Sequence, residues 1–97
     1  MGTYVMLMRL TDKGIAEIKS APKRIEEGIA AFEAMGGKIL GFYTMLGEYD
    51  YLAIGDLPDD ETALSFALAL SSKGFVRTTT LKAISTDAFA GAVRRLP

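Results

Sequence analysis

Apolar residues along this chain are spaced in some segments as in β-strands and in others as in α-helices. Four segments have the pattern of β-strands. Each is rich in β-branched, aromatic or long apolar side chains, which favour a pleated and partly buried backbone. The first is apolar on both faces, because Val5 and Leu7 alternate with equally apolar neighbours, and this is typical of a central strand. The predicted strands span residues 3–10, 38–45, 49–55 and 75–84.

Two longer segments carry apolar residues at the three- and four-residue spacing of an amphipathic helix. The first begins at Pro22, which suits the first turn because its missing N–H would have no partner there, and it ends at Gly36 and Gly37. Its apolar positions are Ile25, Ile29, Phe32 and Met35. The second helix spans residues 59–73 and begins with three acidic residues, which favour the positive end of a helix dipole.

Two short helical segments complete the prediction. Residues 15–19 are expected to form a helical turn in which Ile15 and Ile18 face inward. At the end of the chain, Thr86 or Asp87 is expected to cap a final helix that runs to about Arg95.

The predicted elements occur in the order strand, helix, strand, strand, helix, strand, followed by a helical tail. This is the order of the ferredoxin-like fold, an α+β architecture in which a four-stranded antiparallel sheet carries both helices on one face. We therefore expect residues 1–97 to form a single domain of this kind. The expected spatial order of the strands is fourth, first, third, second.

The composition indicates that the bare face of such a sheet is covered by a partner chain. Hydrophobic residues make up 49% of the chain, and the mean hydropathy is +0.22. Because the first and third strands are apolar on both sides, a second copy packed face to face would bury surface that water solvates poorly. The sequence thus predicts a homodimer with a barrel-like interior. The alternative is a monomer whose sheet is covered by its own C-terminal tail.

Charge and hydropathy argue against nucleic acid and membrane as partners. Eleven basic residues are balanced by twelve acidic ones without blocks of one sign, whereas phosphate binding draws on concentrated Lys and Arg. No apolar run approaches the ~20 residues that span a bilayer. Arg9 interrupts the first hydrophobic run, so we expect no signal peptide and a cytoplasmic location.

The chain contains no Cys, His, Trp, Asn or Gln, which narrows the chemistry available to it. Without Cys and His there is no thiolate nucleophile, no histidine general base and no common transition-metal ligand, and a haem would lack its usual axial ligand. We therefore expect no metal site and no cofactor. Any catalysis would use carboxylate, phenol, hydroxyl or cationic side chains.

The segment from Tyr43 to Asp50 resembles the signature of the GYD domain family, whose three letters fall on Gly47, Tyr49 and Asp50. The likeness covers nearly the whole chain. Its further positions are Arg24, Gly36, Gly37, Pro58, Asp59, Gly74 and residues 78–83. The resemblance implies a dimeric α+β barrel, a superfamily that includes cofactor-free monooxygenases, muconolactone isomerase-like enzymes, haem enzymes and the ligand-sensing domains of leucine-responsive regulators. It supports the fold and leaves the activity open.

Asp50 is the main candidate for chemistry, because it is a carboxylate near the start of an otherwise apolar predicted strand. Its candidate catalytic partner is Tyr43, across the hairpin. The residues expected to bind a ligand are Arg9, Arg24, Tyr49, Arg77, Thr78 and Thr80. In the structural alternative, Asp50 pairs with Arg24 or caps the hairpin turn, and Gly47 supplies a positive φ angle.

Two functions of different classes remain open on the sequence. The first is a module that binds a small molecule, in a pocket between sheet and helices or at the dimer interface. The second is a cofactor-independent enzyme, a monooxygenase or an isomerase, in which Asp50 is the general base and Tyr43 and an Arg are electrophilic partners. The absence of His, Trp and Asn weighs against the enzyme, because oxygenases of the resembled superfamily commonly rely on such residues.

Overall fold

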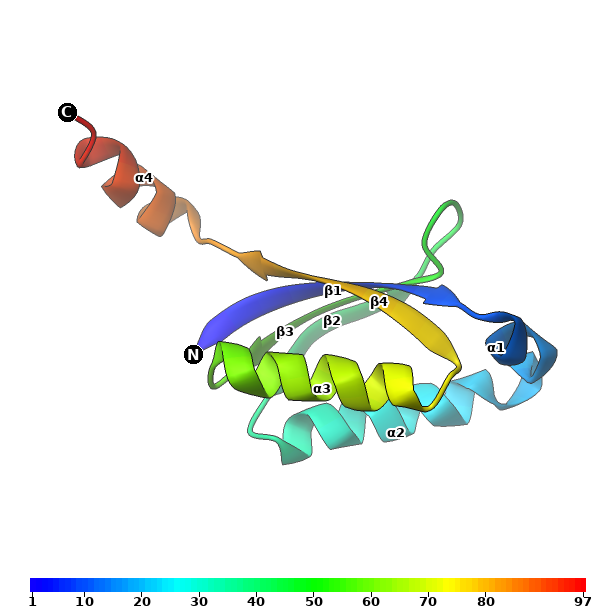
Figure 1. Ribbon diagram of the computed structural model, residues 1–97. Helices are drawn as coiled ribbons and strands as arrows, with labels where there is room; N and C mark the ends of the chain where they lie inside the picture. The colour runs from blue at the N-terminus through cyan, green and yellow to red at the C-terminus, as the bar shows by residue number, and fades with distance from the viewer.

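The computed structural model describes residues 1–97, which form a four-stranded sheet, two long helices on one side of it and a separate C-terminal helix (Figure 1). The strands are β1 (Gly2–Leu10), β2 (Lys38–Thr44), β3 (Tyr51–Leu57) and β4 (Val76–Ala83). The helices are α1 (Asp12–Ala16), the 3₁₀ turn η1 (Ile18–Ser20), α2 (Ala21–Ala34), α3 (Asp60–Ser72) and α4 (Thr86–Arg94). The longest, α2, has 14 residues, and no helix has the length and apolar character of a membrane span.

All neighbouring strands are antiparallel, and they lie in the order β2-β3-β1-β4. This is the spatial order predicted from the sequence. Since α2 and α3 cover the same face of the sheet (Figure 1), the predicted α+β, ferredoxin-like architecture is confirmed. The pairing of β2 with β3 is interrupted by a β-bulge between Ile39 and Gly41, so the outer strand β2 is irregular.

The core lies between the sheet and the two long helices, and alternation along the central strands supplies half of it. The strand residues that are buried against the helices include Tyr4, Met6, Met8, Tyr51 and Ala53. From the helix side come Phe32 of α2 and Phe66 of α3, whose rings meet edge to face with their centroids 5.1 Å apart. Aromatic pairs favour this geometry, and the contact joins the two helices above the sheet.

The opposite side of the sheet, here called the open face, is formed by the residues that alternate with the buried ones. Its apolar members are Val5 and Leu7 of β1, Leu52 and Ile54 of β3, Tyr43 of β2 and Leu81 of β4. Neither long helix covers it (Figure 1). The prediction that β1 and β3 are apolar on both faces is therefore confirmed.

The turn after β1 differs from the prediction. Ile15 and Ile18 are 59% and 46% exposed, and the buried residue of α1 is Gly14. A Cβ on Gly14 would lie 2.2 Å from the carbonyl oxygen of Phe75, which also accepts a hydrogen bond from Thr11 N at 3.0 Å. The backbone of α1 thus packs directly against the chain that enters β4, with Gly14 and not Ile15 on its inner side.

The C-terminal helix is capped by Ser85 and not, as predicted, by Thr86 or Asp87. Ser85 has an extended backbone, and its Oγ accepts a hydrogen bond from Ala88 N at 3.0 Å, which is the usual N-cap arrangement. Beyond it, α4 projects away from the sheet and from the other helices (Figure 1). The alternative in which the tail covers the sheet of its own chain is therefore wrong.

Candidate functional site

Asp50 lies in the loop of the β2–β3 hairpin, because β3 begins at Tyr51 and not at Tyr49 as predicted. Its Oδ2 accepts a hydrogen bond from Leu10 N at 2.8 Å, and its own backbone N donates to Met8 O at 2.9 Å. Both contacts join the hairpin to the end of β1, and the carboxylate satisfies a backbone donor there. This gives Asp50 a structural role in holding the hairpin against β1.

The tip of the same hairpin carries an exposed cluster of charged and aromatic side chains. Arg9 pairs with Glu48, and its guanidinium lies 4.8 Å from the centroid of the Tyr49 ring. Gly47 has a φ angle of +110°, in the region that glycine adopts without strain. Arg9 is thus engaged by residues of the tip and not by Asp50.

Two further predicted site residues lie on the open face. Tyr43 is opposite Leu52 in the β2–β3 pairing and is 60% exposed. Arg77 is opposite Arg9 in the β1–β4 pairing. The side chain of Asp50 makes its hydrogen bond to the backbone of β1 and to neither of these residues, so Asp50, Tyr43 and an Arg are not assembled into one hydrogen-bonded group.

The remaining predicted residues lie on the helix-covered face. Thr78 and Thr80 are opposite Met8 and Met6 in the β1–β4 pairing, which places them on the buried side of β4, and Arg24 belongs to α2. The predicted site residues are therefore divided between the two faces of the sheet. Of the predicted residues, Arg24 also lines a cavity.

A cavity of about 370 Å³ lies between α2 and the helix-covered face of the sheet. Most of the residues that line it are hydrophobic, and they include Met6, Met8 and Tyr51 from the sheet, Phe32 from α2 and Phe66 from α3. Its volume falls within the range of about 300–1,000 Å³ that is usual for small-molecule sites. A cavity is thus present at the predicted place between the sheet and the helices.

Gly28 lies in the middle of α2, one turn from both Arg24 and Phe32, and lines the cavity with them. No atom lies within 4 Å of the position that a Cβ on Gly28 would occupy. A glycine inside a helix costs about 1 kcal/mol relative to alanine, so α2 gives up stability at a place where a larger side chain has room. Gly28 is not among the site residues predicted from the sequence, and the signal that reveals it is an isolated glycine within a helical pattern.

Arg24 forms part of the cavity wall. Its Nη1 donates hydrogen bonds to Glu17 O at 3.1 Å and to Ser20 Oγ, and the guanidinium lies 4.0 Å from the centroid of the Phe75 ring. Its Nη2 is buried without a hydrogen-bond partner. The ion pairs of the structure involve other residues, so the alternative in which Asp50 pairs with Arg24 is wrong.

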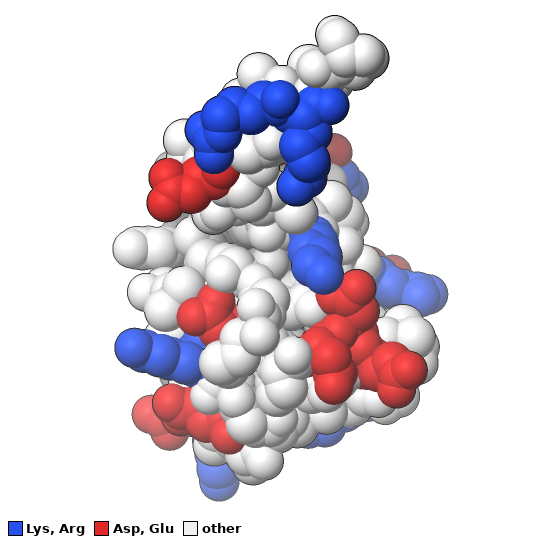
Figure 2. All heavy atoms as spheres, turned by 90° about the vertical axis from the view of Figure 1, so that its left-hand side faces the viewer, with Lys and Arg blue, Asp and Glu red and all other residues white.

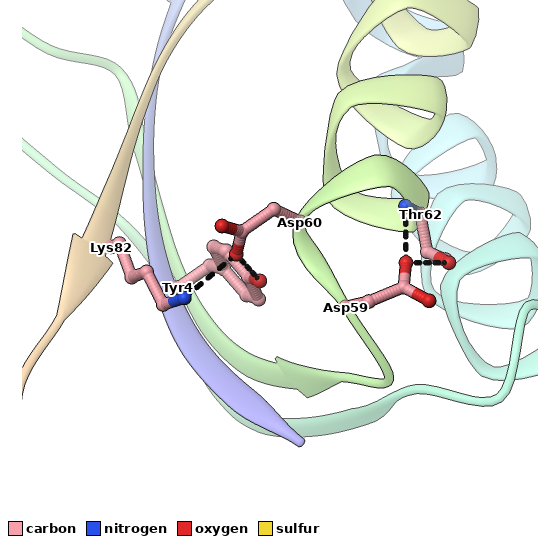
Figure 3. Close-up of polar contacts among 5 residues, drawn as sticks. All are labelled: Tyr4, Asp59, Asp60, Thr62 and Lys82. Carbon is pink, nitrogen blue, oxygen red and sulfur yellow. Dashed lines mark hydrogen bonds and ion pairs between the residues drawn. The ribbon is translucent and has the colours of Figure 1, made fainter.

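At the other end of β1, Tyr4, Asp60 and Lys82 form a hydrogen-bonded cluster (Figure 3). Asp60 Oδ1 accepts from the Tyr4 hydroxyl and from Lys82 Nζ, the latter at 2.9 Å. The hydrogen bond to Asp60, together with burial and the nearby negative charges, raises the pKa of Tyr4 to about 12. The same two donors, Tyr4 first and then Lys82, lower the pKa of Asp60. The cluster thus ties the start of α3 to both β1 and β4.

Asp59, the neighbour of this cluster, is the N-cap of α3 (Figure 3). Its Oδ1 accepts from the Thr62 hydroxyl at 2.7 Å and from Thr62 N at 2.8 Å, and these bonds lower the pKa of Asp59. The structure contains no group of three or more acidic side chains placed to hold a metal ion. The acidic start of α3 is accounted for by capping and by the contacts of Asp60.

We expect these groups to make the stability of the protein depend on pH at both extremes. The folded-state pKa of Asp60 is lowered, so its contribution is present above the unfolded value of about 3.9 and is lost as the pH falls through the folded value. The pKa of Tyr4 is raised from 10.0 to about 12, so its contribution is complete below pH 10.0 and is lost as the pH rises through about 12. Thermal unfolding followed by circular dichroism between about pH 3 and pH 12 measures both effects.

Titration of tyrosine absorbance provides the matched test. One of the four tyrosines should ionise near pH 12 in the folded protein, and Tyr4→Phe should remove that step. If the step persisted in the variant, the assignment to Tyr4 would be incorrect.

Comparison with known proteins agrees with the sequence signature. The family model described as GYD domain matches residues 4–93. A protein of Thermus thermophilus named glutamine synthetase and cystathionine beta-lyase binding protein is 35% identical to this chain over 85 residues, which cover 87% of this chain and 90% of the relative. The chain therefore belongs to the GYD domain family.

Proposed function

We propose that this protein is a homodimeric binding protein that takes a small molecule into the cavity beneath α2. The observation that carries the proposal is the cavity itself, which is walled by apolar side chains of both long helices and of the sheet. A concave, mainly apolar space of this size with a few polar groups in its wall is the usual form of a small-molecule site. A space of about 370 Å³ that a single side chain at Gly28 could partly fill is more consistent with a binding site than with loose packing.

The experiment that tests this proposal fills the cavity from Gly28. The Gly28→Leu side chain would enter the open space and should abolish small-molecule binding, whereas Gly28→Ala should leave binding nearly unchanged. Both variants should be at least as stable as the wild type, because each removes a glycine from a helix interior, worth about 0.5–1 kcal/mol. Binding is measured as the rise in melting temperature in a screen of small apolar compounds. Compounds that still stabilise Gly28→Leu bind elsewhere and would contradict the proposal.

We further propose that a second copy covers the open face. What supports this is the run of apolar residues across its centre, where Val5 is opposite Ile54 and Leu7 is opposite Leu52. An antiparallel sheet face that stays in water is normally polar, and two sheets that bury such faces pack about 10 Å apart. The result would be a two-fold dimer with a closed, barrel-like interior.

A second candidate function is the binding of another protein through α4. Phe89 and Val93 lie one turn apart on this helix and Leu96 follows it, and they are 64%, 47% and 69% exposed. An amphipathic helix seated in an apolar groove is a common mode of protein recognition. Figure 2 shows basic side chains gathered at one end of the molecule, and α4 ends with Arg94 followed by Arg95, so the expected groove has an acidic rim.

The name of the Thermus thermophilus relative supplies candidate partners for this helix, namely glutamine synthetase and cystathionine beta-lyase. Phe89→Ala should weaken capture of the enzyme that this chain binds by about ten-fold or more, as truncation of an aromatic anchor usually does. The matched control is Leu64→Ala, on α3 and 61% exposed, which should have no effect. If Phe89→Ala separates the dimer instead, α4 belongs to the contact between copies and this candidate fails.

A further inference from the structure

We infer that the ligand of the cavity is an amphiphilic monocarboxylic acid, whose carboxylate meets Arg24 while its apolar body lies beneath α2. This inference rests on the proposed function, since it assigns a chemical class to the ligand of the same cavity. Three observations carry it. Arg24 is a cation without an anionic partner, the rest of the cavity wall is mainly apolar, and the charged residues that line the cavity have a net charge of one positive unit.

The guanidinium of Arg24 is held in place but is not neutralised. Nη1 is bound to Glu17 O and Ser20 Oγ, and the Phe75 ring supports the plane of the group. Nη2 remains buried without an acceptor, and arginine does not lose its charge in proteins. Native structures rarely leave such a donor unpaired. A carboxylate is its best complement, because a hydrogen bond from a cationic donor to an ionised oxygen is stronger than one to a neutral acceptor.

The rest of the wall selects for an apolar body. Phe42 and Tyr51 lie with their ring centroids 5.6 Å apart, close to the edge-to-face pair of α2 and α3, and all four rings line the cavity. The thioethers of Met6 and Met8 add adaptable apolar surface. The volume of about 370 Å³ is more than twice that of the roughly 150 Å³ apolar cavity that encloses benzene. A two-ring aromatic acid or a medium-chain fatty acid fits this space.

The charged residues around the cavity favour a single negative charge. Three basic residues, Lys23, Arg24 and Lys73, contribute to the lining together with two acidic ones, Glu17 and Glu27. The lining therefore has an excess of one positive charge. A monocarboxylate balances it, whereas a ligand with several negative charges would meet the two glutamates without further cations to offset them.

The experiment compares acids with alcohols of the same shape by isothermal titration calorimetry on the full chain. The probes are decanoate and 1-decanol, and 2-naphthoate and 2-naphthalenemethanol. The wild type should bind at least one acid about ten-fold more tightly than its alcohol, because the acid alone supplies a charge-assisted hydrogen bond. A preference for decanoate indicates a fatty acid, and a preference for 2-naphthoate indicates an aromatic acid.

Variants at Arg24 connect the preference to the guanidinium. Arg24→Gln should remove most of the preference for the acid and leave the affinity for the alcohol nearly unchanged. Arg24→Lys retains the charge without the planar fork, so it should keep an intermediate preference, and it serves as the test if Arg24→Gln does not fold by circular dichroism. Arg95→Gln, at the exposed end of α4 and absent from the cavity wall, is the control and should bind like the wild type.

The outcomes separate this inference from the proposed function. Equal affinity for acids and alcohols, a preference that survives Arg24→Gln, or no binding of any of the four probes overturns the ligand class alone. Acid binding that persists unchanged in Gly28→Leu overturns both, because the ligand then lies outside the cavity.

Discussion

Replacing Phe32 with alanine is expected to lower the free energy of unfolding by about 3–5 kcal/mol, a large part of the roughly 5–15 kcal/mol available to a domain of ordinary stability. Phe32 is fully buried and packs edge to face on Phe66. The backbone also fits closely around its ring, since a Cβ on either Gly37 or Gly55 would lie 2.6 Å from it. Alanine would therefore leave a void that neighbouring side chains cannot fill without moving two segments of backbone, and that void would add to the existing cavity.

Urea unfolding followed by far-ultraviolet circular dichroism measures this loss, because the chain has no tryptophan to report by fluorescence. Phe32→Leu is the matched control, since it keeps most of the apolar volume and should cost about 1.5 kcal/mol or less. The dependence of the free energy on urea should be unchanged in both variants. A loss below about 1 kcal/mol for Phe32→Ala would show that the structure relaxes around the missing ring and leaves no void.

The second large effect is expected from Leu52→Asp on the open face. Leu52 lies between Leu7 of β1 and Tyr43 of β2, near the centre of the surface that we propose a second copy covers. Two-fold symmetry would bring both aspartates into one apolar interface without partners, and burial of unpaired charge is costly. We expect the variant to dissociate into single folded chains, because the side chain points away from the core.

Analytical ultracentrifugation gives the answer directly, since the wild type at micromolar concentration should have twice the 10.4 kDa mass of one chain and the variant should have that mass alone. Leu64→Asp introduces the same charge on the exposed side of α3 and should leave the dimer intact. A wild type that sediments as a single chain, or a Leu52→Asp protein that remains paired, would refute the proposed interface.

The architecture could be predicted from the sequence because the spacing of apolar residues and the positions of the glycines that end helices agree along most of the chain. A nearly continuous apolar run marks β1, and Gly36 and Gly74 adopt positive φ angles of 88° and 83° after the two long helices. The errors arise where tertiary contacts override local pattern. Ile15 has the spacing of an inward residue, yet the backbone contact at Gly14 turns it outward.

The candidate site was harder to predict, because polar residues next to one another in a strand point to opposite faces. Arg77 and Thr78 are neighbours in the sequence, but one belongs to the open face and the other to the helix-covered face. Residue type alone also favoured Asp50, whose carboxylate is occupied by the backbone of Leu10. The cavity is lined by residues of several elements, among them Gly28, which has no side chain to draw attention in the sequence.

The β-bulge in β2 has a consequence for how copies of this chain associate. Fibrils grow when strand after strand adds to a regular hydrogen-bonding edge. Here one outer strand is interrupted between Ile39 and Gly41, and the other, β4, carries the exposed charges of Arg77 and Lys82. Such edge strands are poor templates for the addition of further strands. The apolar open face can therefore be exposed in a single chain without the edges of the sheet promoting fibril growth.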